Sequence, residues 1–146
     1  MSSPVSEEAR RLVADRADFL CEYCLLHEDD GFFAFQTDHI ISRKHGGASD
    51  ATNLAFACPV CNRRKGSDLG TISRKTGVLI RFFNPRTDVW AAHFSVAGPI
   101  IEPLSDIGDG TARILAFNDN ERVAERQVLI ATGRYPSVAA LARLRL

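Results

Sequence analysis

Four cysteines in two matched pairs carry the most definite chemistry in this sequence. The pairs are Cys21-x-x-Cys24 and Cys58-x-x-Cys61. A two-residue gap lets both thiolates of a pair reach one ion, and two pairs complete a tetrahedron with no open position. The spacing therefore favours a structural zinc ion. A redox dithiol and unpaired core cysteines are the alternatives, and the doubled spacing disfavours both.

Further motifs lie between the two cysteine pairs and directly after the second pair. They are Asp38-His39-Ile40, Gly46-Gly47, Asn53-Leu54 and Cys58-x-x-Cys61-Asn62-x-x-Lys65-Gly66. This order resembles that of the HNH nucleases, and the first cysteine pair resembles their zinc-braced subgroup. The resemblance covers about residues 19–68. The later stretch NPRTDVWAAHF resembles, more loosely, a tail found in some bacterial members.

The resemblance implies a ββα-metal fold, in which a hairpin packs on a helix with the catalytic metal between them. It also implies a role for each of four residues: Asp38 and Asn62 on the metal, His39 as general base, and Asn53 supporting the loop and the orientation of His39. The family name has a histidine where this chain has Asn62. An Asp/Asn oxygen pair should favour Mg²⁺ or Mn²⁺ over softer ions.

The chemistry of these side chains agrees with that implication. Phosphodiester cleavage needs an activated water and neutralisation of the phosphate charge. His39 suits a general base, because an imidazole with a pKa of about 6.5 is largely neutral at physiological pH. Asp38 offers a carboxylate, and Asn62 an amide oxygen, to a hard divalent ion.

Each of these residues also has a plainer interpretation. Asp38 and His39 could be a hydrogen-bonded pair at a strand end, Asn53 a turn residue or helix cap, and Asn62 a partner of the zinc thiolates. Neighbours on a regular strand point to opposite faces. Asp38 and His39 can therefore share one site only if the strand ends, bulges or twists there.

Positive charge is concentrated in the middle of the chain, although the net charge is zero. Residues 61–86 hold seven Lys/Arg and a single acid, and such local fields steer ligands. We predict phosphate contacts from Arg63, Arg64 and Lys65, against the alternative of a solvated helix face. For Arg74, Lys75 and Arg81 two interpretations stay equally open: these residues also contact phosphates, or they do not.

The elements that must position these residues follow from pattern. The first half predicts a helix over 4–20 capped by Ser6, a strand over 31–41, a loop, a short strand over 54–59 and a helix that has Pro59 in its first turn and stops near 66–70. The second half predicts strands over 77–85, 88–96, 98–104 and 111–118, a loop at 105–110, a helix over 119–132 capped by Asn118, and an amphipathic end from Pro136.

We therefore expect an α+β fold in one domain, 1–146. It would comprise an N-terminal helix, the ββα-metal core with its four-cysteine zinc site (19–68) and a strand-then-helix extension (69–146) packed as one body. Phe32, Phe33 and Phe35 are assigned to the core and His93 to the core or a strand pair, with His27 and His45 on the surface.

The sequence is best interpreted as a small HNH-type endonuclease acting on double-stranded DNA, with a structural Zn²⁺ and a catalytic Mg²⁺ or Mn²⁺. A catalytically silent zinc module that binds nucleic acid is the alternative. The neutral net charge suggests a third, a zinc-stabilised interaction domain. No stretch approaches the roughly 18 apolar residues of a membrane span, and no signal segment is evident, so a cytoplasmic location is expected. A homodimer would allow paired cuts.

Overall fold

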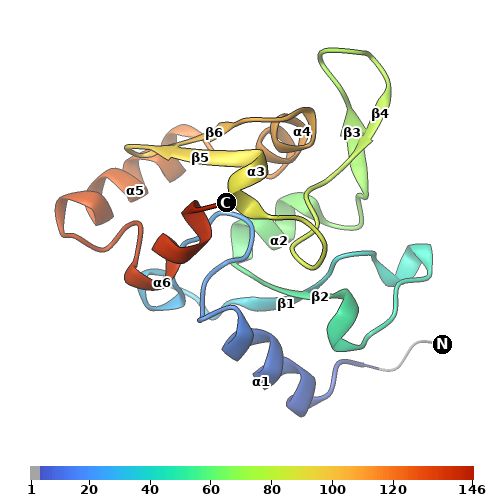
Figure 1. Cartoon of the computed structure of the whole chain (residues 1–146). Helices are drawn as coiled ribbons and strands as arrows, with labels where there is room; N and C mark the ends of the chain where they lie inside the picture. Colours follow the sequence, from blue (N-terminus) through green and yellow to red (C-terminus); the bar gives the residue numbers. More distant parts are fainter. Residues whose placement is uncertain (1–3) are drawn as a thin grey trace.

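The structure is a computed structural model that describes residues 4–146, and within that range six α-helices surround three two-stranded antiparallel hairpins (Figure 1). The elements in the first half are α1 (Glu7–Arg16), β1 (Gln36–His39), β2 (Leu54–Ala57), α2 (Pro59–Lys65), β3 (Gly70–Ile72) and β4 (Leu79–Arg81). Those in the second half are α3 (Trp90–His93), β5 (Phe94–Ala97), β6 (Ile100–Pro103), α4 (Asp106–Ile114), α5 (Asn120–Ala131) and α6 (Val138–Leu141). The mixed α+β class is as expected.

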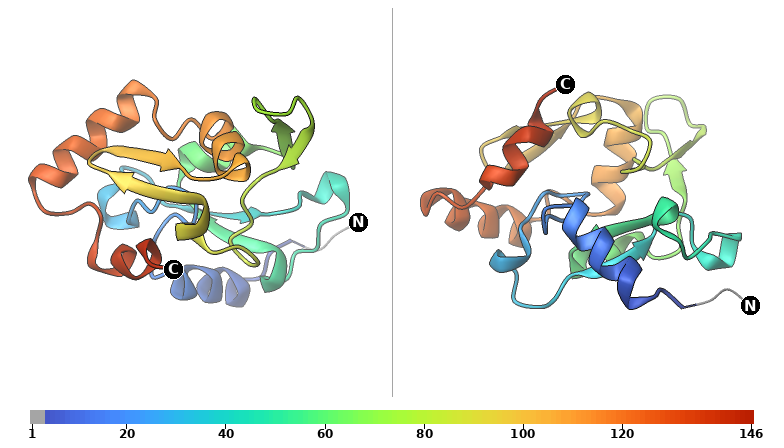
Figure 2. Two further views of the ribbon diagram at one scale, coloured as in Figure 1. Left: turned by 45° about the horizontal axis from the view of Figure 1, so that its top comes forward. Right: turned by 60° about the horizontal axis from the view of Figure 1, so that its bottom comes forward.

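The hairpin β1–β2 and the helix α2 form a ββα unit. In its register Asp38 lies opposite Ala55 and His39 opposite Leu54. The helix α2 starts directly after β2 and packs on β1, while α1 lies across the hairpin (Figure 2, right). As predicted, Pro59 occupies the first turn of α2, where its missing N–H costs nothing. Ser6 caps α1 by accepting from the Ala9 N–H.

Several predicted strands take a different form. The segment 111–118, predicted as a strand, lies in α4 and the turn after it, and the predicted loop 105–110 supplies the start of that helix. Ser105 caps α4 by accepting from the Gly108 N–H. The buried face of α4 is made of small residues, and a Cβ on Gly108 would lie 2.2 Å from the His93 carbonyl oxygen. This close approach explains why the helix carries a glycine at position 108.

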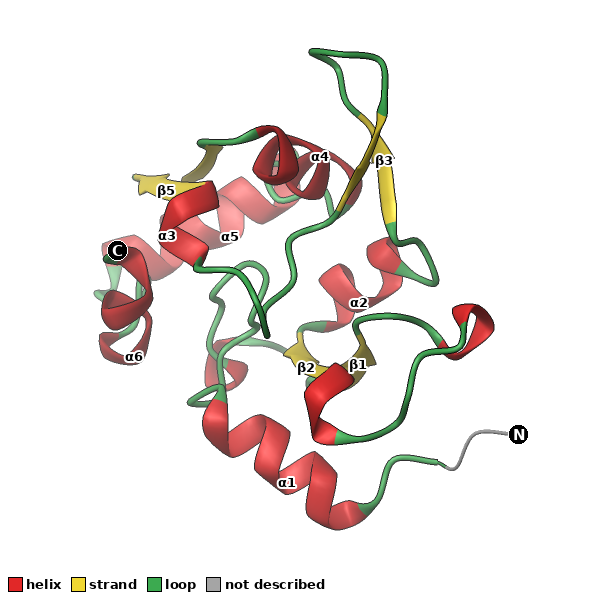
Figure 3. Cartoon of the chain, turned by 45° about the vertical axis from the view of Figure 1, so that its right-hand side comes forward, coloured by secondary structure: helices red, strands yellow, loops and turns green. Residues whose placement is uncertain are grey.

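Other helices and strands begin or end at residues different from those predicted from the sequence. The predicted strand 31–41 is reduced to β1, and 88–96 divides into the single turn α3 and the strand β5. The helix predicted for 119–132 begins at Asn120 with Asp119 at the cap position, because the Asn118 side chain bonds Ile101 instead. β3, for which no strand was predicted, pairs with β4 in a hairpin that projects from the body (Figure 3).

The two halves share one continuous apolar core. Phe56 from β2 and Trp90, Phe94 and Phe117 from the second half belong to the same buried cluster. The Trp90 ring N–H also donates to the Tyr23 carbonyl at 2.9 Å, which ties the halves together by a buried polar contact. No helix within residues 4–146 is long and apolar enough to cross a membrane.

Candidate active site and metal centre

The four cysteines converge into a buried cluster. Their sulfur atoms all lie within 4.8 Å of one another, and Cys24 and Cys58 are 3.8 Å apart. Sulfur atoms bound at about 2.3 Å to one tetrahedral ion are roughly 3.8 Å apart. None of the four cysteines forms a disulfide. Burial raises the pKa values of Cys21 and Cys61 well above the ordinary value, whereas hydrogen bonds from the other three cysteines hold the pKa of Cys24 well below it. This donor set fits a structural zinc ion.

Both cysteine pairs adopt the same local turn. The N–H of Cys24 points to the sulfur of Cys21 at 3.5 Å, and the N–H of Cys61 to the sulfur of Cys58 at 3.4 Å. We call the first turn, Cys21-Glu22-Tyr23-Cys24, the first knuckle. The second is the cap of α2, so any ion in the cluster also fixes where α2 begins.

A buried arginine from α5 completes the surroundings of the thiolates. The guanidinium of Arg122 lies 3.3 Å from the Cys61 sulfur and 3.6 Å from that of Cys58. Burial works against its charge, yet the thiolates of the cluster raise the pKa of Arg122 above its ordinary value. Sequence reasoning missed this residue. The signal was available, since Arg122 and Arg126 are four residues apart on one face of the helix.

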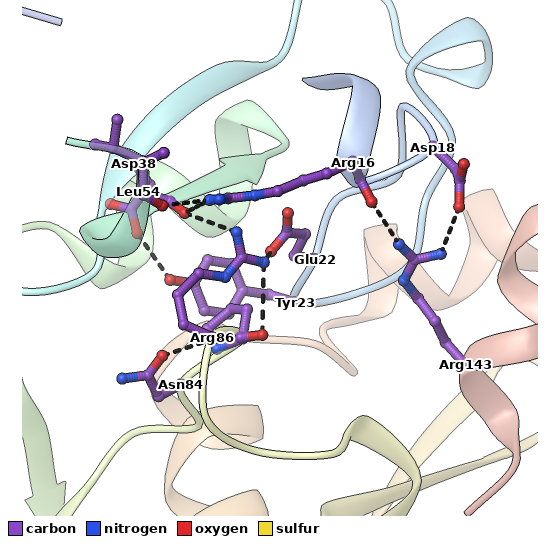
Figure 4. A network of polar contacts seen from close by, with 11 residues as sticks. Arg16, Asp18, Glu22, Tyr23, Asp38, Leu54, Asn84, Arg86 and Arg143 are labelled. Carbon is purple, nitrogen blue, oxygen red and sulfur yellow. Dashed lines mark hydrogen bonds and ion pairs between the residues drawn. The ribbon is translucent and has the colours of Figure 1, made fainter. Parts of the chain in front are cut away.

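Asp38 lies in the interior, where two side chains hold it (Figure 4 shows the Tyr23 contact). The Tyr23 hydroxyl donates to Oδ2 at 2.8 Å, and Nζ of Lys65 is 3.2 Å from Oδ2 and 3.4 Å from Oδ1. The Asp38 side chain is 5% exposed. Burial raises the pKa of Asp38, although Lys65 and Tyr23 both act to lower it.

The position of Lys65 corrects a sequence-based expectation. Its side chain is 2% exposed, and its ammonium donates to the His39 carbonyl at 2.9 Å as well as to Asp38. A cation committed to two buried acceptors does not face solvent, so the predicted phosphate contact from Lys65 does not fit its position. The structure instead brings Lys65 together with Asp38 and the backbone of His39.

β1 ends at His39. A strand end at this point is one of the conditions under which Asp38 and His39 could share a site. The two side chains nevertheless have different partners: Asp38 meets the first knuckle and α2, while Nε2 of His39 is 2.9 Å from the Ser49 hydroxyl. Burial lowers the pKa of His39, helped by Arg43 and Lys65 and opposed by Asp38. No pattern in the sequence singled out Ser49.

Asn53 closes the loop that follows His39. Its amide nitrogen donates to the carbonyls of Ile41 and Ala48, each at 2.8 Å, and its oxygen accepts from the Ile41 N–H at 2.9 Å. Gly47 passes so close that a Cβ there would lie 1.7 Å from the Ile41 oxygen. These contacts fix the loop that carries Ser49.

Asn62 lies on the face of α2 that meets β1. Its amide donates to the side-chain oxygen of Gln36, two residues before Asp38 on the strand. Asn62 and Lys65, one helical turn apart on α2, therefore meet Gln36 and Asp38, two residues apart on β1. Asn62 is thus beside the Asp38 site instead of bonded to the thiolates.

Most of the basic middle segment is neutralised by acids from elsewhere. Arg64 pairs with Asp119 at 3.4 Å, and the other pairs are Arg74–Asp109, Arg81–Asp88 and Arg86–Glu22. Arg63 is exposed on α2 and lines a polar groove of about 550 Å³ together with Arg64 and Asn118. Of the predicted phosphate contacts, Arg63 and Arg64 are the two at the surface.

The predictions for the remaining aromatic and histidine residues are confirmed in part and wrong in part. Phe35 is buried, but Phe32 and Phe33 are 94% and 75% exposed, so their assignment to the core is wrong. Phe32 and Phe33 lie in the bend before β1, where no regular strand directs alternate side chains toward the core. His93 lies in α3 instead of a strand and bonds the Ser105 hydroxyl, and His45 is exposed.

A hairpin followed by a helix, braced by four cysteines and carrying Asp38-His39 at a strand end, is the arrangement of a zinc-braced ββα nuclease core. Residues 21–68 match the family model described as HNH endonuclease. The chain therefore contains an HNH endonuclease domain over these residues, with the four-cysteine cluster typical of zinc-bound HNH domains. Comparison with curated proteins found no match, and neither did comparison with solved structures.

Proposed function

We propose that the protein is a metal-dependent endonuclease that hydrolyses phosphodiester bonds in DNA. The observation that carries this proposal is Asp38-His39 at the end of β1, held against α2 within the HNH domain. A structural zinc in the cysteine cluster would hold the start of α2, and with it Asn62, beside the strand.

The donors offered to a divalent ion are a carboxylate and an amide oxygen, which fit Mg²⁺ or Mn²⁺. Asp38 and Asn62 would hold the ion. The hydrogen bond from Asn62 to Gln36 uses the amide nitrogen and leaves its oxygen as the donor atom. When bound, the ion would supply positive charge to the phosphate and the leaving oxygen.

His39 would act as the general base. Its lowered pKa keeps the imidazole neutral at physiological pH, so it can accept a proton. Ser49 engages Nε2, which leaves Nδ1 to take the proton from water. The water oxygen then bonds to phosphorus, the bond from phosphorus to the leaving oxygen breaks, and that oxygen takes up a proton from solvent. Asn53 contributes by fixing the loop that carries Ser49.

Arg63 and Arg64 would contact phosphates of the DNA backbone. They lie on α2, the helix that also supplies Asn62, and border the groove between α2 and the start of α5. Phosphate contacts of this kind position a duplex without reading its sequence.

Nicking of supercoiled plasmid DNA tests the proposal. Wild-type protein should nick in Mg²⁺ or Mn²⁺, and His39→Ala should lower the rate by about 10²- to 10⁴-fold, the usual contribution of a general base. Zinc content should stay unchanged, because His39 is outside the cysteine cluster.

His45→Ala is the matched control. Because His45 is exposed in the loop after β1, this variant should cleave DNA at the wild-type rate. Equal rates for wild type and His39→Ala would contradict the proposal. Salt-sensitive DNA binding without cleavage in any divalent ion would instead establish the silent nucleic-acid-binding module.

A further inference from the structure

The Asp38 carboxylate is oriented by a residue of the first knuckle. Among its protein contacts the shortest is the hydrogen bond from the Tyr23 hydroxyl to Oδ2, at 2.8 Å, compared with 3.2 Å and 3.4 Å for Lys65. Both Tyr23 and Asp38 are buried, so water does not compete for this bond. A buried hydrogen bond to an ionised acceptor is among the stronger ones in proteins.

Tyr23 is itself fixed by the knuckle. It stands between Cys21 and Cys24, and the turn is closed by the Leu25 N–H, which donates to the Cys21 carbonyl at 2.9 Å. On the other side the Tyr23 carbonyl accepts from the Trp90 ring N–H at 2.9 Å. The ring is fully buried, so the place of the hydroxyl is determined by the backbone of the knuckle.

Lys65 cannot do this alone. Its ammonium ends a flexible four-carbon stem and divides its donors between Asp38 and the His39 carbonyl. Lys65 therefore supplies compensating charge, whereas the rigid phenol sets the direction of the carboxylate. The bond does not block an ion, because Tyr23 and Lys65 both contact Oδ2, whereas Oδ1 has the longer, 3.4 Å contact with Lys65 and keeps a lone pair for an ion.

We propose that Tyr23 is a positioning residue: it fixes the Asp38 carboxylate relative to the first knuckle, so the cysteine cluster shapes the divalent-ion site. This inference rests on the proposed role of Asp38. It connects the cysteine cluster with the divalent-ion site through the Tyr23 hydroxyl, a connection that the HNH motif does not include. In Figure 4 Tyr23 points toward Asp38 from the segment that carries Glu22, which is itself held by Arg86.

The test is Tyr23→Phe, which keeps the ring and removes only the hydroxyl. Mn²⁺ affinity, measured by electron paramagnetic resonance of the free ion, and the kcat for plasmid nicking should each fall by about 10- to 100-fold, the usual effect of losing a partner of a metal ligand. The KM for DNA should hold. Zinc content and the thermal midpoint should match those of the control.

Tyr135→Phe is the matched control. The chain has two tyrosines, and Tyr135 is also buried, with its hydroxyl donating to the Cys24 carbonyl at 3.0 Å. It touches the same knuckle without reaching Asp38, so it should keep Mn²⁺ affinity and kcat. In an Asp38→Asn background, Tyr23→Phe should cause no further loss of Mn²⁺ affinity, because the hydroxyl acts through that carboxylate.

The outcomes separate this inference from the proposed function. Wild-type nicking with unchanged Mn²⁺ affinity and kcat in Tyr23→Phe would overturn the inference and leave the nuclease standing. A wild type that binds Mn²⁺ but never nicks, with weaker binding in Tyr23→Phe, would overturn the nuclease and support the inference. Loss of zinc or of folding in Tyr23→Phe, or equal losses in both variants, would show a purely structural tyrosine and overturn it. A wild type that neither nicks nor binds Mn²⁺ would overturn both.

Discussion

At the residue scale, burial determines whether a charged side chain stabilises the interior or is available to a ligand. Lys65 and Arg63 are two positions apart on α2, yet one is enclosed with Asp38 and the other faces solvent. Removing one partner of a buried ion pair leaves an uncompensated charge, which costs about 3–5 kcal/mol. An exposed arginine usually changes stability by less than about 0.5 kcal/mol when replaced.

Lys65→Met should therefore lower the free energy of unfolding by about 3–5 kcal/mol, measured by urea denaturation of the zinc-loaded protein. Arg63→Met should leave stability within about 0.5 kcal/mol and weaken salt-sensitive DNA binding. Equal stability of the two variants, with equal loss of DNA binding, would return Lys65 to the surface role suggested by its sequence position.

The site residues show which single-residue predictions a sequence supports. Fixed spacing identified the cysteines, and they do converge. Spacing could not distinguish the environments of Lys65 and Arg63, because adjacent cations in a run look alike until the helix is docked. Ser49 carries no pattern at all, since its contact with His39 depends on how the loop after β1 is folded.

At the scale of elements, α5 is the helix of the extension that places a side chain against the cysteine sulfur atoms. Arg122 points at the thiolates, while Arg126, one turn later, donates to the Pro99 and Phe117 carbonyls. A tetrahedral zinc bound by these four thiolates would carry net negative charge, and Arg122 would compensate it within the protein interior.

Arg122→Met should accelerate zinc loss to a chelator, with zinc affinity lower by about 10-fold or more. Arg126→Met is the control on the same helix, and it should destabilise the fold without a specific effect on zinc release from the folded protein. The measurement is chelator absorbance over time at a temperature where both variants remain folded. Identical release rates would mean that the Arg122 contact does not stabilise the centre.

Element predictions succeeded where caps and special residues mark an end. Ser6 and Pro59 located the starts of α1 and α2 to within a few residues. The segment 111–118 failed because a short apolar run suits a buried strand or a buried helix, and only the docking of small residues against α3 and the β3–β4 hairpin selects the helix. β3 was missed although its pairing with β4 is local, because a three-residue strand is too short to show an alternating pattern.

At the scale of the whole molecule, the extension and the HNH domain are joined by buried polar contacts as well as by core packing. Trp90 and Tyr135 donate to carbonyls of the first knuckle, and Arg86 pairs with Glu22 (Figure 4 shows the Arg86 contacts). Separation of the halves would break these contacts and expose the shared apolar core to water, and this couples their stabilities.

Zinc removal should therefore unfold both halves together. Zinc binding contributes about 10–16 kcal/mol in small zinc folds, as much as or more than the roughly 5–15 kcal/mol that stabilises a whole domain. The single tryptophan, Trp90, reports the boundary between the halves. Its emission should shift to the red in one transition with the loss of helical circular dichroism during chelation. An unchanged Trp90 signal in zinc-free protein would show that the extension folds independently.

The hydrogen bond from Tyr135 to Cys24 joins residues 111 positions apart in the chain. During translation the first knuckle leaves the ribosome long before Tyr135 or Arg122 does. A nascent chain therefore presents the HNH motif before its surroundings are complete. We expect the HNH domain to reach its full stability only after Tyr135 has left the ribosome, because until then the first knuckle lacks its contacts with the extension.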